Sequence, residues 1–169
     1  FSQGGAMTWR FICAHSDVLA SAAPAAEEAC FDGASAPAHE IPILFMHGTK
    51  DALVPFANAT KQRDAVVSAW QMDAGQQIAG DGTFTRTRYT SPKGTVFEFI
   101  QHDYEAGSCL LKLGGHCFPG SDDHAGGLPG QACAFACIAP NAFTWGEEVM
   151  QFFIAFRHQP GQIPHNGFE

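Results

Sequence analysis

The chain has 169 residues, the usual size of a single domain and enough to bury a hydrophobic core. Its apolar fraction of 46% excludes a disordered or collagen-like chain, and no apolar run approaches the roughly 18 residues that cross a bilayer. The net charge is −8 with only nine Lys and Arg, so nucleic acids and anionic membrane surfaces are poor partners, and neutral substrates suit the chain better.

The first third of the chain predicts a helix and two strands. Residues 5–15 suit a buried helix, and residues 18–23, closed by Pro24, suit a short strand; a loop rich in Ala, Gly, Ser and Pro follows over 27–40. Residues 41–46 are the clearest strand, because a continuous apolar run indicates a strand covered on both faces.

The rest of the chain predicts a helix, further strands and a closing helix. Residues 56–72 have helical spacing, 83–90 alternate as in a strand with one wet face, and 95–100 return as a second strand after a turn. The remaining expected elements are a weaker strand at 110–113, a loop at 119–130, an amphipathic helix at 144–158 and an irregular tail at 159–169.

This alternation of strands and helices predicts an α/β fold with a mostly parallel sheet flanked by helices. No internal repeat or composition shift marks a second domain, so residues 1–158 are expected to form one catalytic domain and 159–169 its tail. Polar residues just past strand ends are the place to look for a site in such a fold.

Three short segments carry residues suited to nucleophilic catalysis. Phe1-Ser2-Gln3-Gly4-Gly5 matches the end of G-x-S-x-G, the tight strand-to-helix turn that exposes a serine nucleophile. The alternative is a serine that only caps the following helix.

The second segment places Asp51 in the turn after the strand at 41–46, where its carboxylate can orient a histidine. The alternative is an aspartate that bonds its own turn. His47, beside it, is expected to have a structural role.

The third segment is Gly114-Gly115-His116, in which two glycines let the loop approach the nucleophile closely. His124 lies beside Asp122 and Asp123 and could suggest a metal site, but solvated loop charge is the favoured interpretation. Serine, acid and histidine occur in the chain order that the α/β-hydrolase fold requires.

Six cysteines without a C-x-x-C pair favour disulfides formed in an oxidising compartment over a zinc site. Buried free thiols are the alternative, and the sequence does not choose among the pairings. The cysteines are Cys13, Cys30, Cys109, Cys117, Cys133 and Cys137.

These segments resemble the secreted polyhydroxybutyrate depolymerase and feruloyl esterase family of α/β hydrolases. The similarity covers residues 1–7, 47–55 and 115–120, and extends to the closing helix with Trp145. The resemblance implies a secreted or periplasmic serine ester hydrolase with Ser2 as nucleophile, Asp51 as acid and His116 as base.

The family places several strands before the nucleophile and takes one oxyanion donor from an earlier loop. We therefore expect this chain to be the C-terminal part of a hydrolase, with an N-terminal segment of the same hydrolase as its partner. The backbone N–H of Gln3 is expected to supply the other oxyanion contact.

A triad hydrolase needs no cofactor, and the chain has no phosphate loop or dinucleotide fingerprint. Phe118 and Trp70, with Phe135 and Phe143, could shape an aromatic acyl pocket, although core packing is the usual role of such residues. The alternatives are a lipase or peptidase of the same fold, and an inactive hydrolase fragment or binding module.

Overall fold

A computed structural model describes residues 1–30, 37–107, 112–120 and 135–157. Within these ranges the chain has a mixed α/β architecture, with helices α1 (Gln3–His15), α2 (Phe56–Ala69) and α3 (Trp145–Ala155). A short 3-10 helix, η1 (Ser16–Val18), follows α1. The strands are β1 (Ile43–Gly48), β2 (Gln76–Gly80), β3 (Phe84–Thr90) and β4 (Val96–His102).

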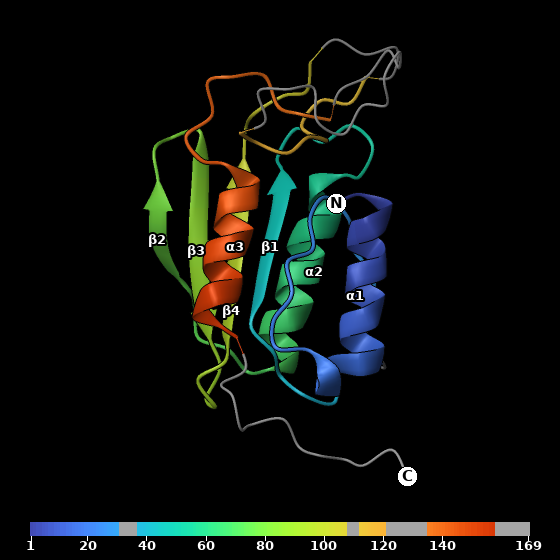
Figure 1. Cartoon of the computed structure of the whole chain (residues 1–169), viewed down its shortest axis with the longest axis vertical. Helices are drawn as coiled ribbons and strands as arrows, with labels where there is room; N and C mark the ends of the chain where they lie inside the picture. The colour runs from blue at the N-terminus through green and yellow to red at the C-terminus, as the bar shows by residue number, and fades with distance from the viewer. Residues whose placement is uncertain (31–36, 108–111, 121–134, 158–169) are drawn as a thin grey trace.

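The four strands form one sheet in the order β1-β4-β3-β2 (Figure 1). Only β1 and β4 are parallel, whereas β4–β3 and β3–β2 are antiparallel. The prediction of a mostly parallel sheet is therefore wrong for the described strands. The reason lies in the connections: β2, β3 and β4 follow one another through short turns at 81–83 and 91–95, and such short links reverse the chain instead of carrying it across the sheet.

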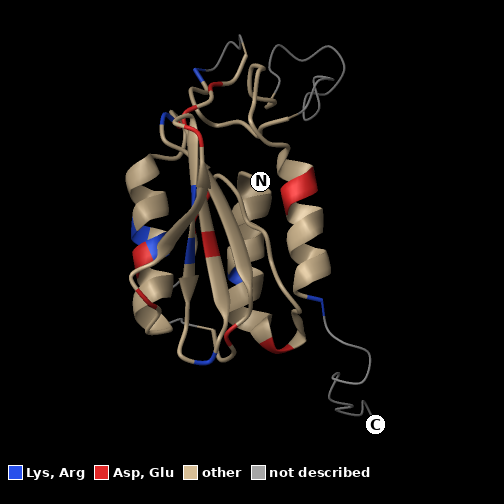
Figure 2. Ribbon diagram, turned by 90° about the vertical axis from the view of Figure 1, so that its left-hand side faces the viewer, with Lys and Arg blue, Asp and Glu red and all other residues tan. Residues whose placement is uncertain are grey.

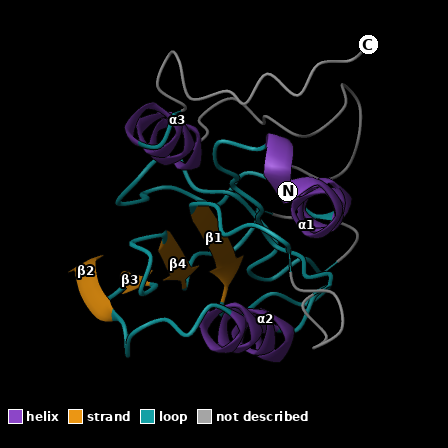
Figure 3. Cartoon of the chain, turned by 90° about the horizontal axis from the view of Figure 1, so that it is seen from below, coloured by secondary structure: helices purple, strands orange, loops and turns teal. Residues whose placement is uncertain are grey.

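Helices cover both faces of the sheet, with α2 on one face and α3 on the other (Figure 3). The face of α2 is filled by a cluster that includes Trp9 of α1, Phe45 of β1 and Val66 of α2. The opposite face buries Leu44 and Met46 of β1 against Phe152 of α3. All six residues of β1 are buried, as its continuous apolar run predicts for a strand covered on both sides.

The expected strand at 18–23 is also wrong. Residues 16–18 form the 3-10 helix, and the extended segment lies later, at residues 22–26, alongside β1. Ala22 and Ala25 make isolated parallel bridges to Ile43 and Met46 of β1. Pro24 has no N–H to donate, so the segment cannot complete a regular ladder, although it still accepts a bond from Met46 N–H at 3.3 Å.

The other expected elements occur with shifted ends. The helices predicted at 5–15, 56–72 and 144–158 begin or end within three residues of their expected bounds, and so do the strands predicted at 41–46, 83–90 and 95–100. Strand β2 was not expected; all five of its residues are exposed, so it has no apolar pattern that would reveal it. Residues 112–113, from the expected strand at 110–113, are not in a strand, and most of the loop at 119–130 and the tail at 159–169 lie outside the described residues.

Two disulfides join parts of the chain that the structure describes. Cys13 at the end of α1 bonds to Cys30, and Cys117 bonds to Cys137. Disulfides between these positions confirm the expectation of oxidised cysteines for these four residues and are consistent with an oxidising extracellular or periplasmic location. Cys109 and Cys133 lie outside the described residues.

Candidate active site

Ser2 sits at the point where the chain enters α1, in a conformation that few residues adopt. Its φ is 53° and its ψ is −130°, so the backbone turns sharply just before the helix begins. The Ser2 N–H donates to the carbonyl oxygen of Ala25 at 3.0 Å, which attaches the turn to the edge segment at 22–26. A non-glycine residue held at positive φ is strained, and such strain is concentrated at functional sites. The capping alternative is not supported, because the Ser2 side chain makes no cap hydrogen bond to α1.

Gly5 sets how closely α1 approaches the edge segment. It is buried, and a Cβ at this position would lie 2.4 Å from the carbonyl oxygen of Ala25. That is the same carbonyl to which Ser2 N–H donates. A Cβ on neighbouring Gly4 would meet no heavy atom within 4 Å. The second of the two glycines, not the first, therefore allows the close packing that positions Ser2.

Replacing Gly5 with alanine should lower the free energy of unfolding by about 1–3 kcal/mol, the usual range for overpacking a tight site. Gly4→Ala is the matched control and should leave stability unchanged or raise it by about 0.5–1 kcal/mol, because alanine is the better helix former. Urea unfolding followed by tryptophan fluorescence measures both variants. Equal stabilities for the two variants would contradict this account of Gly5.

Asp51 follows β1 directly, and its own turn holds the carboxylate in place. The Oδ1 atom accepts the N–H of Leu53 at 2.9 Å and the N–H of Val54 at 2.8 Å. This is the turn-forming behaviour that the sequence left open as an alternative. It leaves Oδ2 directed at His116, so one carboxylate both closes the turn and contacts the histidine.

His116 links Asp51 to Ser2. Its Nδ1 lies 2.7 Å from Asp51 Oδ2, and its Nε2 lies 3.0 Å from Ser2 Oγ. The His116 residue is 1% exposed. Because Asp51 accepts at Nδ1, the neutral ring carries its proton there and presents Nε2 as the acceptor for the Ser2 hydroxyl. The three residues predicted from separate motifs therefore lie in one hydrogen-bonded line.

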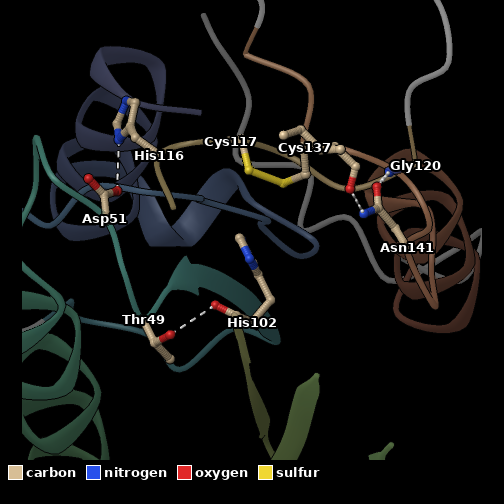
Figure 4. Close-up of a disulfide and its surroundings, with 9 residues drawn as sticks. Thr49, Asp51, His102, His116, Cys117, Gly120, Cys137 and Asn141 are labelled. Carbon is tan, nitrogen blue, oxygen red and sulfur yellow. Dashed lines mark hydrogen bonds and ion pairs between the residues drawn. A yellow bond between two sulfur atoms is a disulfide. The ribbon is translucent and has the colours of Figure 1, made fainter. Parts of the chain in front are cut away.

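The loop that carries His116 is fixed on both sides. Gly114 has a φ of +55°, and a Cβ there would lie 2.2 Å from the carbonyl oxygen of Lys50. Gly115 N–H donates to the same carbonyl at 2.8 Å, which brings the loop onto the turn before Asp51. On the other side, Cys117 is disulfide-bonded to Cys137 (Figure 4).

Aromatic rings surround the imidazole of His116. The Phe1 ring lies 4.9 Å from the His116 ring and 5.4 Å from that of Phe118. Phe135 is 6.0 Å from His116 and 5.9 Å from Phe1. These rings form an apolar wall beside the base, and two of them, Phe118 and Phe135, are among the aromatic residues that the sequence offers for an acyl pocket.

Trp70 does not belong to this wall. It caps the C-terminal end of α2 and is buried in the core cluster with Phe97 and Met72. The helix begins at Phe56, beside the turn of Asp51, and its 14 residues carry the chain about 20 Å away. The core interpretation of Trp70 is the one that the structure supports. Phe143 packs against Phe84 and Tyr104.

Gln3 begins α1, where backbone N–H groups point away from the helix with no partner inside it. This position suits an oxyanion contact, because the N-terminal end of a helix favours negative charge. Ser2 and the Gln3 N–H are adjacent in the chain, so a carbonyl attacked by Oγ would develop its charge next to this donor.

Two buried histidines lie near Asp51; the sequence predicts a structural role for His47 and no particular role for His102. His47 on β1 is 0% exposed, and burial lowers its pKa below the usual value. His102 on β4 is 1% exposed, and burial lowers its pKa to about 4. Both are therefore neutral at pH 7. The pattern H-G-x-x-D was visible in the sequence, but the contact that His47 makes depends on how the turn folds back.

Within the described ranges, no group of three or more His, Cys, Asp or Glu is arranged to hold a metal ion. His124, with Asp122 and Asp123, lies outside those ranges. None of the described helices is both long and apolar enough to span a membrane.

A search of protein-family models finds no match for this sequence. A comparison with curated proteins finds no significant match either.

Proposed function

We propose that the chain carries the nucleophile, base and acid of a serine carboxylic-ester hydrolase of the α/β-hydrolase class. The observation that supports this proposal best is the line of hydrogen bonds from Ser2 Oγ through His116 to Asp51 Oδ2. A serine, an imidazole and a buried carboxylate in this order form the relay used in acyl transfer. The strained backbone at Ser2 supports the same proposal.

The reaction proceeds in two steps. His116 Nε2 accepts the proton of Ser2 Oγ as the oxygen attacks the ester carbonyl, and the resulting imidazolium donates its proton to the leaving alcohol. A water molecule then loses its proton to His116, attacks the acyl-serine and releases the acid. Asp51 stabilises the imidazolium in both steps, and the Gln3 N–H stabilises the oxyanion.

The substrate class is a neutral carboxylic ester, as in polyesters or the acyl groups of plant polysaccharides. The apolar wall of Phe1, Phe118 and Phe135 beside His116 favours an apolar or aromatic acyl group over a charged one. The net charge of −8 also disfavours anionic substrates. The two disulfides support a secreted or periplasmic enzyme.

We further propose that an N-terminal segment of the same hydrolase packs beside α1 and supplies a second oxyanion donor. An open hollow of about 350 Å³ lies there, lined by Met7, Phe11, Ala23 and Phe153. Of these, Met7 on α1 is 67% exposed and Phe153 on α3 is 36% exposed. Exposed apolar side chains gathered around a hollow are typical of an interaction surface. The edge segment at 22–26 also lies at this border of the sheet, where a further strand could pair.

An inactive fragment or binding module is the second candidate, and the same exposed apolar surface favours it. If the second oxyanion donor is missing, the chain loses roughly 2.7–4 kcal/mol of transition-state stabilisation and becomes a poor catalyst. The hydrogen bond between Ser2 and His116 would then be a retained structural feature without a catalytic role.

A fluorophosphonate probe separates these candidates, because it forms a covalent adduct only with an activated serine. We expect intact-mass and peptide spectra of the purified protein to show one adduct on Ser2. The adduct should be absent in Ser2→Ala and in His116→Ala. His15→Ala, which changes an exposed histidine at the end of α1, should leave labelling unchanged. A folded wild-type protein that acquires no adduct would contradict the hydrolase proposal and favour the inactive fragment.

A further inference from the structure

His47 lies beneath the turn that presents Asp51. It occupies β1 four residues before the aspartate, and its ring lies between those of Phe45 and Phe56, each 6.1 Å away between ring centres. The site is closed to solvent, since the side chains of both His47 and Asp51 are 0% exposed. A buried histidine at this position either only packs in the core or also donates a hydrogen bond to a specific acceptor.

The contacts of its Nε2 atom distinguish these two roles. Nε2 lies 2.9 Å from the carbonyl oxygen of Val54 and 3.4 Å from Asp51 Oδ2. A carbonyl oxygen can only accept, so the proton of the neutral ring must reside on Nε2. That N–H therefore donates to the Val54 carbonyl, and it does so beside the carboxylate oxygen that accepts from His116.

The turn is therefore closed from two directions. Val54 N–H donates to Asp51 Oδ1, while the Val54 carbonyl accepts from His47 on the strand below. Neither hydrogen bond alone connects the carboxylate to β1. Together they tie residues 51–54 to the most buried strand of the sheet, which limits how far Asp51 Oδ2 can move relative to His116.

We propose that His47 is a positioning residue of the hydrolase site, whose Nε2–H anchors the Asp51 turn to β1 and lies beside the Asp51 oxygen that accepts from His116. This inference rests on the proposed ester-hydrolase function. His47 touches neither the substrate nor Ser2, so it acts through Asp51 alone.

The charged and titratable groups around His47 are few. Asp51 and His116 face it from the two site loops, His102 faces it from β4, and Glu27 contributes a more distant negative charge. Removing the Nε2–H takes the positive end of a dipole from beside Asp51 Oδ2, 3.4 Å away, and makes that oxygen a stronger acceptor for His116. The imidazolium of His116 is then held more tightly, so more base is needed to free it for catalysis.

Two pairs of variants test this inference. His47→Leu removes the donor at similar volume, and the control is Gln62→Leu, which changes a buried polar residue of α2. His47→Gln places an amide N–H near the position of Nε2, whereas His47→Asn is equally polar but too short to reach it. The second pair remains informative if the leucine variant does not fold.

The measurement is the rate constant for labelling of Ser2 by a fluorophosphonate, taken from pH 5 to 9 on protein shown to be folded by circular dichroism. His47→Leu and His47→Asn should slow labelling about 10²-fold, the usual effect of misplacing a catalytic group by about 1 Å. The acid limb of the pH–rate profile should also move to higher pH by about half a unit, because the oxygen that faces His116 loses a nearby N–H dipole. His47→Gln and Gln62→Leu should keep the wild-type limb.

Unchanged labelling and an unchanged acid limb in folded His47→Leu would overturn the inference. So would a slower rate with no shift of the limb, because a purely structural role predicts that result. If the wild-type protein itself is not labelled at Ser2, the proposed function fails first; the Nδ1–H proton resonance of His116 then still reports whether His47→Leu changes the contact with Asp51.

Discussion

Asp51→Asn should lower the rate of Ser2 labelling about 10⁴-fold, the size of effect seen when the acid of a serine triad becomes an amide. The structure gives a specific reason for expecting this loss. Asp51 Oδ1 accepts two backbone N–H groups, from Leu53 and Val54. In the asparagine variant only the amide oxygen can take that position, so the NH₂ group must point at His116.

An NH₂ group at that position donates to His116 Nδ1 and forces the ring proton onto Nε2. The ring then presents a donor to Ser2 Oγ, where catalysis requires an acceptor. It also faces the N–H of His47, so two donors meet at 3.4 Å. The turn itself keeps both backbone bonds, and the variant should therefore stay folded.

The measurement is the labelling rate beside the urea midpoint, with Asp103→Asn as control because Asp103 lies on a neighbouring loop and bonds only Thr49 among the described side chains. A loss of less than tenfold in folded Asp51→Asn would mean that Asp51 does not orient His116 during the reaction. A large loss accompanied by unfolding would instead assign Asp51 to the stability of its turn.

Glu98→Ala should lower the free energy of unfolding by about 3 kcal/mol, because it removes a buried carboxylate that accepts charge-assisted hydrogen bonds from two arginines. Glu98 lies on β4 and is 0% exposed, on the face that α3 covers. Its Oε2 accepts from Arg86 Nε at 2.6 Å and its Oε1 from Arg88 Nε at 2.7 Å, both on β3. In Figure 2, blue segments (Lys or Arg) on one strand of the sheet lie beside a red segment (Asp or Glu) on the next strand.

Arg86 also pairs with Glu148 of α3, so the carboxylate of Glu98 organises the contact between the sheet and that helix. Glu105→Gln is the matched control: its pair with Lys50 has side chains 54% and 53% exposed, and such pairs contribute about 0.2–1 kcal/mol. Urea unfolding with tryptophan fluorescence compares the two. Similar losses in both variants would show that the buried carboxylate adds no more than a surface charge.

The sequence predicted the three site residues because each lies in a local pattern with a chemical reason. Ser2 precedes a glycine pair, Asp51 follows a fully apolar strand, and His116 follows two glycines. These patterns depend on neighbours in the chain, and the structure brings the three side chains together.

What the sequence did not predict depends on contacts between distant segments. The direction of β2 and β3 follows from turn lengths, but the exposed residues of β2 have no periodic pattern to mark it as a strand. The proximity of Phe1 to His116 and the tether from His47 to Val54 both need the folded turn. Trp70 was considered for a pocket because it is aromatic, whereas its place at the far end of α2 puts it in the core.

The separation of the site residues along the chain bears on when the site forms. Asp51 and His116 are 65 residues apart, and Ser2 and His116 are 114 apart. Contacts across such loops form only after much of the entropy of loop closure has been lost, so they develop late and slowly compared with the hairpin of β2 and β3. We therefore expect a refolding chain to form the β2–β3 hairpin before its serine becomes reactive, so that labelling of Ser2 by the probe reports a late step of assembly.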